Sequence, residues 1–227
     1  MFACGRAYDQ IRNSICYPNL NVKICATHVG LTVGEDGATH QMLEDISIMC
    51  GLPNMTVITT SDDYQTRWVV KEIAKTKGPV YLRLCRLDTP VIYDENTKFE
   101  IGKAVQIGTG TDVTIFATGA TVSVAIEAAE ELKKMKIHAR VVDVFTLKPI
   151  DEEIIIKSAM ETNKLISIED HNIQGLGGVI SQVLTDKYPK KLTRIGVNNK
   201  FGKSGKPHEL LDFFGINVEG IVKAAMN

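Results

Sequence analysis

A short stretch near the N-terminus, residues 27–41, concentrates side chains that can ionise or move protons. His28 and His40 bracket the stretch, and Asp36 lies between them. An imidazole can donate, accept or shuttle a proton near neutral pH, and a carboxylate can accept a hydrogen bond from a hydroxyl group. This combination suits a substrate that carries a carbonyl and several hydroxyl groups.

The stretch lies between two expected elements of secondary structure. An apolar run at 22–27 predicts a strand, and a helix-like run follows at 41–50. In α/β proteins, ligand-contacting groups gather just beyond the carboxyl end of a strand, which favours a functional loop. A glycine-rich turn or a helix cap uses the same residue types without any ligand. Spacing alone therefore leaves both interpretations open.

The overall composition is that of a globular protein with balanced charge. Of 227 residues, 44% are hydrophobic, which is enough for a sizeable core. The 26 basic and 27 acidic side chains leave a net charge of -1, which argues against a broad surface for nucleic acid or an anionic membrane. Without a membrane-length apolar run or signal-peptide pattern, we expect a soluble, cytoplasmic protein. The 5 cysteines show no zinc-like spacing and are expected to be reduced thiols.

Strands and helices are expected to alternate along the chain. In the first part, strands are predicted at 22–27, 55–60 and 80–84, with helices at 5–16, at 41–50 and from the capping pair Asp62 and Gln65 to Gly78. In the second part, strands are predicted at 113–117, 138–144, 165–169 and 192–197, with helices at 121–135, 151–160, 176–187 and two within 207–226.

This alternation predicts an α/β protein of two stacked domains, each a mostly parallel sheet flanked by helices. We place the first domain at 1–86 and the second at 112–227. The looser, glycine-containing pattern over 87–111 is interpreted as a connection between them.

Three motifs in the second half have simple structural explanations. Gly175-Leu176-Gly177-Gly178 opens a predicted helix, but its third glycine has the wrong interval for a dinucleotide fingerprint, which favours close helix packing. The run Glu169-Asp170-His171 suggests a catalytic triad, yet no serine on a nucleophile elbow completes it, so we expect a strand-end loop at an interface. Lys200, Lys203 and Lys206 are typical of a solvated loop.

The glycine-rich loop has a more specific resemblance. Thr27-His28, followed by the run from Gly34 to Gln41, resembles the substrate loop of transketolases, which are thiamine diphosphate enzymes. The resemblance continues along essentially the whole chain, through Phe2–Tyr8, Ile11-Arg12, Leu52–Met55, Val80–Arg86, the surroundings of Gly119 and Phe201–Pro207. It implies an N-terminally incomplete thiamine diphosphate-binding fold followed by a transketolase C-terminal-like domain.

The resemblance implies a role for each of five residues. His28 matches the family's histidine that helps to bind the sugar phosphate, and Asp36 matches an aspartate that recognises a substrate hydroxyl. His40 matches the histidine beside the thiamine and the reacting carbonyl, where an imidazole can stabilise or protonate an oxyanion. Arg86 matches the arginine that holds the substrate phosphate, and Phe2 an aromatic that cradles the aminopyrimidine ring. His28 and His40 are thus the expected catalytic residues.

The resemblance also implies groups outside this sequence. Family members carry, upstream, a glutamate that activates the cofactor and a domain whose Gly-Asp-Gly motif binds metal and diphosphate. We therefore expect thiamine diphosphate and magnesium as cofactors, with the diphosphate and metal ligands elsewhere. Glu35 and Asp36 alone do not make a coordination set, so no metal ligand is predicted here. Ala38 and Cys50 depart from the proline and the arginine that are usual in the family.

The expected function is that of a C-terminal portion or subunit of a transketolase-like transferase. Such an enzyme moves a two-carbon ketol unit from a ketose phosphate to an aldose phosphate. Alone, the chain is expected to bind thiamine diphosphate poorly and to be inactive. Its expected partners are sugar phosphates, an N-terminal transketolase portion, and further copies in a homodimer or a larger complex, but not nucleic acid or a membrane.

Other functions share parts of this pattern. A deoxyxylulose phosphate synthase or the beta subunit of a 2-oxoacid dehydrogenase has the same architecture, although His28 and His40 around Gly-Glu-Asp-Gly favour transketolase. A noncatalytic dimerisation or regulatory module is the alternative from a different class. A nicotinamide oxidoreductase would rest on doubly wound domains alone, and the dinucleotide fingerprint is missing.

Overall fold

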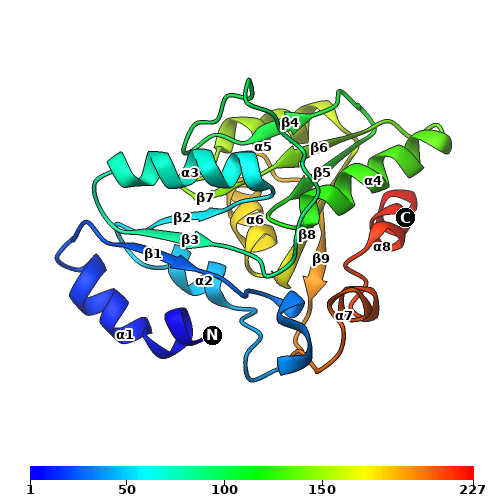
Figure 1. Ribbon diagram of the computed structural model, residues 1–227. Helices are drawn as coiled ribbons and strands as arrows, with labels where there is room; N and C mark the ends of the chain where they lie inside the picture. Colours follow the sequence, from blue (N-terminus) through cyan, green and yellow to red (C-terminus); the bar gives the residue numbers. More distant parts are fainter.

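The computed structural model describes residues 1–227 and contains two sheets (Figure 1). The first sheet has 4 strands in the order β1, β3, β2 and β7. Their bounds are Lys23–Ala26 for β1, Val80–Arg83 for β3, Thr56–Thr59 for β2 and Thr146–Lys148 for β7. Strands β1 and β2 run parallel to β3, whereas β7 runs antiparallel to β2. Because β7 comes from the second half of the chain, this sheet is built by both halves.

The second sheet has 5 strands in the order β4, β6, β5, β8 and β9. Their bounds are Val105–Ile107 for β4, Ala139–Asp143 for β6, Val113–Ala117 for β5, Lys164–Asn172 for β8 and Leu192–Val197 for β9. Only the edge strand β4 is antiparallel to its neighbour. The prediction of an α/β fold with two mostly parallel sheets is confirmed.

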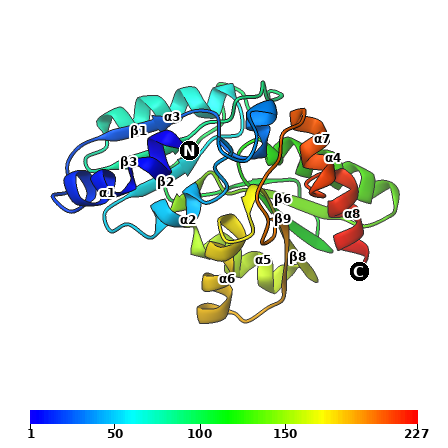
Figure 2. The ribbon, with the colours of Figure 1, turned by 90° about the horizontal axis from the view of Figure 1, so that it is seen from below.

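Helices cover both faces of each sheet (Figures 1 and 2). The helical segments of the first half are η1 (Phe2–Arg6), α1 (Tyr8–Gln10), η2 (Ile11–Cys16), η3 (Leu31–Asp36), α2 (Asp45–Cys50) and α3 (Asp63–Lys75). Those of the second half are α4 (Thr121–Lys134), α5 (Glu152–Glu161), α6 (Leu176–Lys187), α7 (Pro207–Phe213) and α8 (Val218–Met226). No helix has the length and apolar character required to cross a bilayer.

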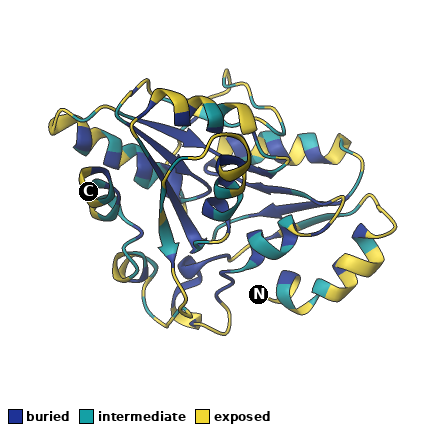
Figure 3. Ribbon diagram, turned by 180° about the vertical axis from the view of Figure 1, so that it is seen from behind, coloured by how far each residue is buried: buried dark blue, intermediate teal, exposed yellow.

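The alternation of side chains along the strands divides the interior into separate cores. In β3, Tyr81 faces the helix α2, whereas Val80 and Leu82 face α3 on the opposite side of the sheet. The core that contains Tyr81 also includes Met49 of α2 and Ile180 of α6, so it extends from one half of the chain into the other. Figure 3 shows the inner strands of both sheets as the most deeply buried part of the molecule, whereas the edge strands β1, β4 and β9 are more exposed.

Several local predictions are confirmed. The Asp62 carboxylate accepts a hydrogen bond from the Gln65 backbone N–H at 2.8 Å, which caps α3. Asp151 caps α5 in the same way, through the Ile154 N–H at 3.3 Å. Close packing explains two of the glycines at the start of α6, since a Cβ at Gly175 would lie 2.3 Å from a Glu169 carboxylate oxygen and one at Gly177 would lie 2.8 Å from a side-chain carbon of Arg194. A Cβ at Gly178 would have no atom closer than 3.7 Å.

Other local predictions need correction. The helix expected at 41–50 begins only at Asp45, because the Gln41 side chain is turned inward and donates to the Leu31 and Gly34 carbonyl oxygens. Within the expected loop, Leu31–Asp36 forms the short helical segment η3. Strand β7 was not expected, and the short strand β4 lies within the range 87–111 that was interpreted as a connection.

The run Glu169-Asp170-His171 is not a loop, as the sequence suggested, but the buried end of strand β8. The strand continues to Asn172, which pairs with Val197 after a register shift. Buried charged groups can occupy this strand because the fold supplies their partners. The Glu169 carboxylate, for example, accepts hydrogen bonds from the N–H groups of Leu176 and Gly177, at 2.6 and 2.9 Å, at the start of α6.

His171 joins the two halves of the protein. Its Nδ1 lies 2.8 Å from the Asn172 carbonyl oxygen, and its Nε2 accepts the N–H of Ile46 at 3.1 Å, at the start of α2. This arrangement requires a neutral imidazole with its proton on Nδ1. Burial lowers the pKa of His171 to about 4, although the Asp45 carboxylate opposes this shift. Asp45, Arg83 and Glu169 are the ionisable groups that face the ring, and burial raises the pKa of Glu169 to about 8.

We expect His171 to make folding sensitive to acid. The unfolded chain binds a proton at this site below about pH 6.5, whereas the folded state does so only below about pH 4. The contribution of His171 to the free energy of unfolding is therefore fully present above pH 6.5, and about 3 kcal/mol of it is lost as the pH falls to 4. A His171→Gln variant, whose side-chain oxygen can still accept from Ile46, should lose this component of the pH dependence in urea unfolding.

His138, an exposed histidine, offers the matched control. A His138→Gln variant should keep the pH dependence of the wild-type protein. Parallel stability curves for the wild-type and His171→Gln proteins between pH 7 and pH 4 would contradict the assignment of a neutral His171.

Candidate functional site

A pocket of about 260 Å³ lies at the carboxyl end of β1. Four residues singled out in the sequence line it, namely Phe2, His28, Asp36 and His40. The remaining wall is largely apolar and includes Met1, Ala3, Cys4, Val29, Val33 and Met42. The pocket thus places two imidazoles and a carboxylate beside an apolar surface.

Each histidine of the pocket is paired with the threonine that precedes it. The Nδ1 atom of His28 lies 3.0 Å from the Thr27 hydroxyl, and that of His40 lies 2.9 Å from the Thr39 hydroxyl. Where the hydroxyl donates to Nδ1, the neutral ring carries its proton on Nε2 and can donate it to a ligand. His28 also has a φ of 64°, a left-handed conformation that is unusual for a residue other than glycine and places the ring at a sharp turn after β1.

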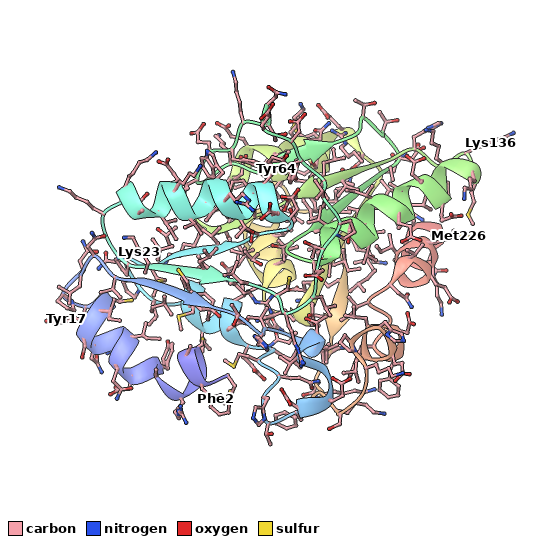
Figure 4. All side chains as sticks on the ribbon, viewed as in Figure 1. Phe2, Tyr17, Lys23, Tyr64, Lys136 and Met226 are labelled. Carbon is pink, nitrogen blue, oxygen red and sulfur yellow. The ribbon has the colours of Figure 1, made fainter.

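Phe2 and His40 form one aromatic corner of the pocket. Their rings meet edge to face, with centroids 5.1 Å apart and an interplanar angle of 83°. Phe2 comes from η1, at the edge of the molecule (Figure 4), and its side chain is 44% exposed. The Arg6 guanidinium lies 4.8 Å from the centre of its ring. A partly exposed phenyl ring on an apolar wall can pack against a planar heteroaromatic group.

Arg86 lies next to the pocket but not in its wall. Its Nη1 donates to the Val33 carbonyl oxygen at 2.5 Å and lies 4.0 Å from the Asp36 carboxylate. Both Arg86 and Asp36 are about half exposed, with side-chain accessibilities of 42% and 53%. The guanidinium therefore keeps donors free for an anionic group next to the carboxylate.

The segment that carries Asp36 is fixed from strand β8, through a contact that the sequence did not reveal. The Asp170 carboxylate accepts hydrogen bonds from the N–H of Leu31 at 2.7 Å and from the hydroxyl of Thr32 at 2.8 Å. The Thr32 N–H donates a longer hydrogen bond, of 3.4 Å, to the same carboxylate. This approach requires glycine at position 30, where φ is +70° and a Cβ would lie 2.2 Å from an Asp170 oxygen.

The middle of the same loop is held by the segment before α7. The buried Gln41 amide donates to the Lys203 carbonyl oxygen at 3.0 Å. A Cβ at Gly37 would lie 2.5 Å from the Ser204 hydroxyl oxygen, so the two segments are in close contact. The side chains of Lys200, Lys203 and Lys206 are exposed, as predicted, but the backbone of this loop supports the pocket.

Two features in the sequence could have pointed to these supporting residues. Glu169-Asp170-His171 directly follows the apolar run Leu165–Ile168, so three ionisable residues continue a buried strand. Gln41 follows His40 at the start of a predicted helix, yet it is buried as a link between loops. Neither pattern identifies the distant partners, because the contacts of Asp170 with Leu31 and of Gln41 with Lys203 connect positions more than 100 residues apart.

The residues of the pocket fit a flat heteroaromatic ring better than a metal ion. The apolar wall and the exposed Phe2 ring suit such a ring, and the imidazole groups add hydrogen-bond donors at its rim. No group of three or more histidine, cysteine, aspartate or glutamate side chains has a geometry that could hold a metal ion. All five cysteines are free.

Comparison with protein families gives two consecutive matches. Residues 1–91 match the model of the transketolase pyrimidine binding domain, and residues 102–221 match that of the transketolase C-terminal domain. Together, the matched ranges cover nearly the whole chain.

Comparison with individual proteins indicates the same family. A protein of Methanocaldococcus jannaschii, provisionally named as a transketolase C-terminal section, is 52% identical over the whole chain and 72% of its own length. The 6-deoxy-6-sulfo-D-fructose transketolase subunit of a Clostridium species is 41% identical, over 99% of this chain and 70% of its own. Mouse transketolase is 38% identical, and the match covers 96% of this chain but only 36% of the mouse protein.

Among solved structures, a split-gene transketolase described as an inactive beta4 tetramer superposes with a TM-score of 0.93. It is 44% identical, and the match covers 99% of this chain and 72% of that one. The agreement of both family models, the relatives and the superposed structure shows that this chain belongs to the transketolase family, with matches to its pyrimidine-binding and C-terminal domains.

Proposed function

We propose that this chain is the C-terminal portion of an enzyme that transfers a two-carbon ketol unit from a ketose phosphate to an aldose phosphate, with thiamine diphosphate and magnesium as cofactors. The proposal rests on one observation: Phe2, His28, Asp36 and His40 line the same pocket in a chain of the transketolase family. Two imidazoles, one carboxylate and an apolar wall are the groups that a sugar and a thiamine ring require.

The cofactor would occupy the apolar side of the pocket. When bound, thiamine diphosphate supplies the carbon nucleophile that accepts and passes on the ketol unit. Phe2 would pack against its pyrimidine ring, and Met42 and Val33 would exclude water from that side. The ligands of the diphosphate and of magnesium belong, in this proposal, to an N-terminal partner.

The polar residues would bind the sugar and stabilise charge. The Nε2–H groups of His28 and His40 would donate hydrogen bonds to the substrate's carbonyl oxygen as negative charge develops on it. The Asp36 carboxylate would accept a hydrogen bond from a substrate hydroxyl. Arg86, 4.0 Å from Asp36, would bind the anionic end of the same substrate.

The named relatives support an assembly of separate chains. Two of them are named as transketolase subunits or sections, and the split-gene structure is described as an inactive tetramer of its beta chain. By analogy, this chain would be inactive alone and active in a complex with an N-terminal portion, as a dimer of such pairs or a larger assembly. The sulfofructose relative makes a sulfonate an alternative to a phosphate at Arg86. We also propose a cytoplasmic location.

Activity should depend on the partner. We expect no ketol transfer from a ketose phosphate by this chain alone with magnesium and thiamine diphosphate, but turnover after addition of an N-terminal transketolase portion. The measurement is the rate of aldose phosphate release from the ketose phosphate in the presence of a second aldose phosphate as acceptor, and the rate of carbon dioxide release when pyruvate is the donor. Turnover of pyruvate in place of the ketose phosphate would instead indicate a deoxyxylulose phosphate synthase or a 2-oxoacid dehydrogenase, and turnover by the chain alone would contradict the need for a partner.

His40 should contribute directly to the rate. In the complex, His40→Ala should lower kcat by about 10²- to 10⁴-fold, which is the usual range for a lost acid–base or oxyanion-stabilising group. The control is His208→Ala, because His208 is exposed on α7 and does not line the pocket. Unchanged kcat in both variants would favour a noncatalytic role for this chain.

Arg86 should distinguish charged from neutral substrates. Loss of one charge-assisted hydrogen bond is worth about 1.5–3 kcal/mol, so Arg86→Ala should raise KM for a ketose phosphate by roughly 10- to 100-fold. The KM for the same sugar without its phosphate should change little. Equal effects on both sugars would show that Arg86 supports the loop through Val33 and does not bind the anionic group.

A further inference from the structure

The loop that carries the pocket's polar residues is held at both ends by one strand of the other sheet. At its start, Asp170 of β8 binds Leu31 and Thr32. At its end, the N–H of Asn172 in the same strand donates to the Leu43 carbonyl oxygen at 3.0 Å. The second sheet therefore determines where the loop of the first half begins and ends.

The Asp170 side chain is buried and held in place where it binds the loop. The carboxylate is only 5% exposed and has donors from two consecutive residues of the loop. Its own backbone is fixed as well, because the buried Arg83 donates to the Asp170 carbonyl oxygen at 2.9 Å. Gly30 leaves the space in which the carboxylate reaches the loop.

The segment between this anchor and the pocket is short, and it has a kink at Gly34, where φ is +86° and ψ is -123°. Leu31 begins η3, and Asp36 ends it. Within η3, the Val33 carbonyl oxygen accepts the hydrogen bond from Arg86, whose guanidinium lies beside Asp36. A shift of the backbone at Leu31 would therefore move the Val33 acceptor of Arg86 directly, and would move Asp36 through the turn at Gly34.

We propose that Asp170 is a positioning residue, which sets the place of Asp36 and Arg86 for substrate recognition although it lies in the second sheet and does not line the pocket. The inference rests on the proposed function and extends it. It gives the C-terminal domain a direct part in substrate binding, through a carboxylate whose burial is compensated by hydrogen bonds to the loop.

The test uses two variants and a matched control. Asp170→Asn replaces one acceptor oxygen by an amide that faces the donors of the loop. Thr32→Val removes the hydroxyl, which lies 2.8 Å from the Asp170 carboxylate and 3.1 Å from the Val29 carbonyl oxygen, and keeps the shape of the side chain. It therefore weakens the same contact if Asp170→Asn does not fold. The control is Asp143→Asn, since Asp143 is also buried and accepts hydrogen bonds from Ser61, Gln65 and Tyr93, but none from the loop.

Two readouts separate positioning from general stability. In the chain alone, hydrogen exchange should accelerate roughly tenfold or more at the amides of Leu31 to Asp36 in Asp170→Asn, and less in Thr32→Val. In the complex with an N-terminal portion, KM for the ketose phosphate should rise about tenfold, whereas kcat should change no more than about twofold. Asp143→Asn should leave both the exchange of this segment and KM unchanged.

Each outcome bears on one claim. Unchanged exchange at 31–36 in both loop-anchor variants would overturn the role of Asp170, whatever the activity. Faster exchange with an unchanged KM would show that the anchor does not affect recognition, which also overturns the proposal. If the wild-type complex shows no ketol transfer, the proposed function fails, and the exchange result still decides whether Asp170 holds the loop.

Discussion

The buried ion pair between Arg83 and Asp45 is the interaction on which the junction of the two sheets depends. The Arg83 Nε lies 2.7 Å from the Asp45 carboxylate, with side-chain accessibilities of 4% and 0%. Tyr81 donates its hydroxyl to the same carboxylate at 2.8 Å. Burial alone would raise the pKa of Asp45, but Arg83 and the other hydrogen-bond donors hold it below its usual range. The charges are retained because each has a partner.

Each member of this ion pair belongs to an element that also contacts strand β8. Arg83 is at the end of β3, three residues before Arg86, and its guanidinium also binds the backbone of Asp170. Asp45 begins α2, whose Ile46 N–H is accepted by His171. Loss of one partner would leave a charge uncompensated in the interior, a defect of about 3–5 kcal/mol. The ion pair thus couples the order of the pocket's supporting elements to the stability of the whole fold.

The sequence predicted the parts of this protein whose causes are local. The periodicity of apolar residues gave the order of strands and helices, and the caps at Asp62 and Asp151 formed as expected from neighbouring residues. The loop residues His28, Asp36 and His40 lie together because they belong to one short stretch after β1. Phe2 reaches the same pocket from a separate helical segment, a placement implied by the family resemblance but not by periodicity.

The features that local reasoning missed depend on distant partners. A carboxylate such as Asp170 is normally exposed, and only its donors at Leu31 and Thr32 make its burial favourable. Strand β7 is too short to be recognised by its own pattern, because it forms only by pairing with β2. Long-range pairing of this kind has no signature within a window of ten or twenty residues.

Strand β7 also determines how modular this chain can be. It follows β6 of the second sheet almost directly, yet it completes the first sheet as an edge strand beside β2. A gene fragment that stopped between the two family matches, near residues 91–102, would encode a first sheet with β2 as a bare edge. The two halves therefore have separate family models but do not have separate folds, so a recombination event that exchanges one half must preserve the β2–β7 pairing to remain viable.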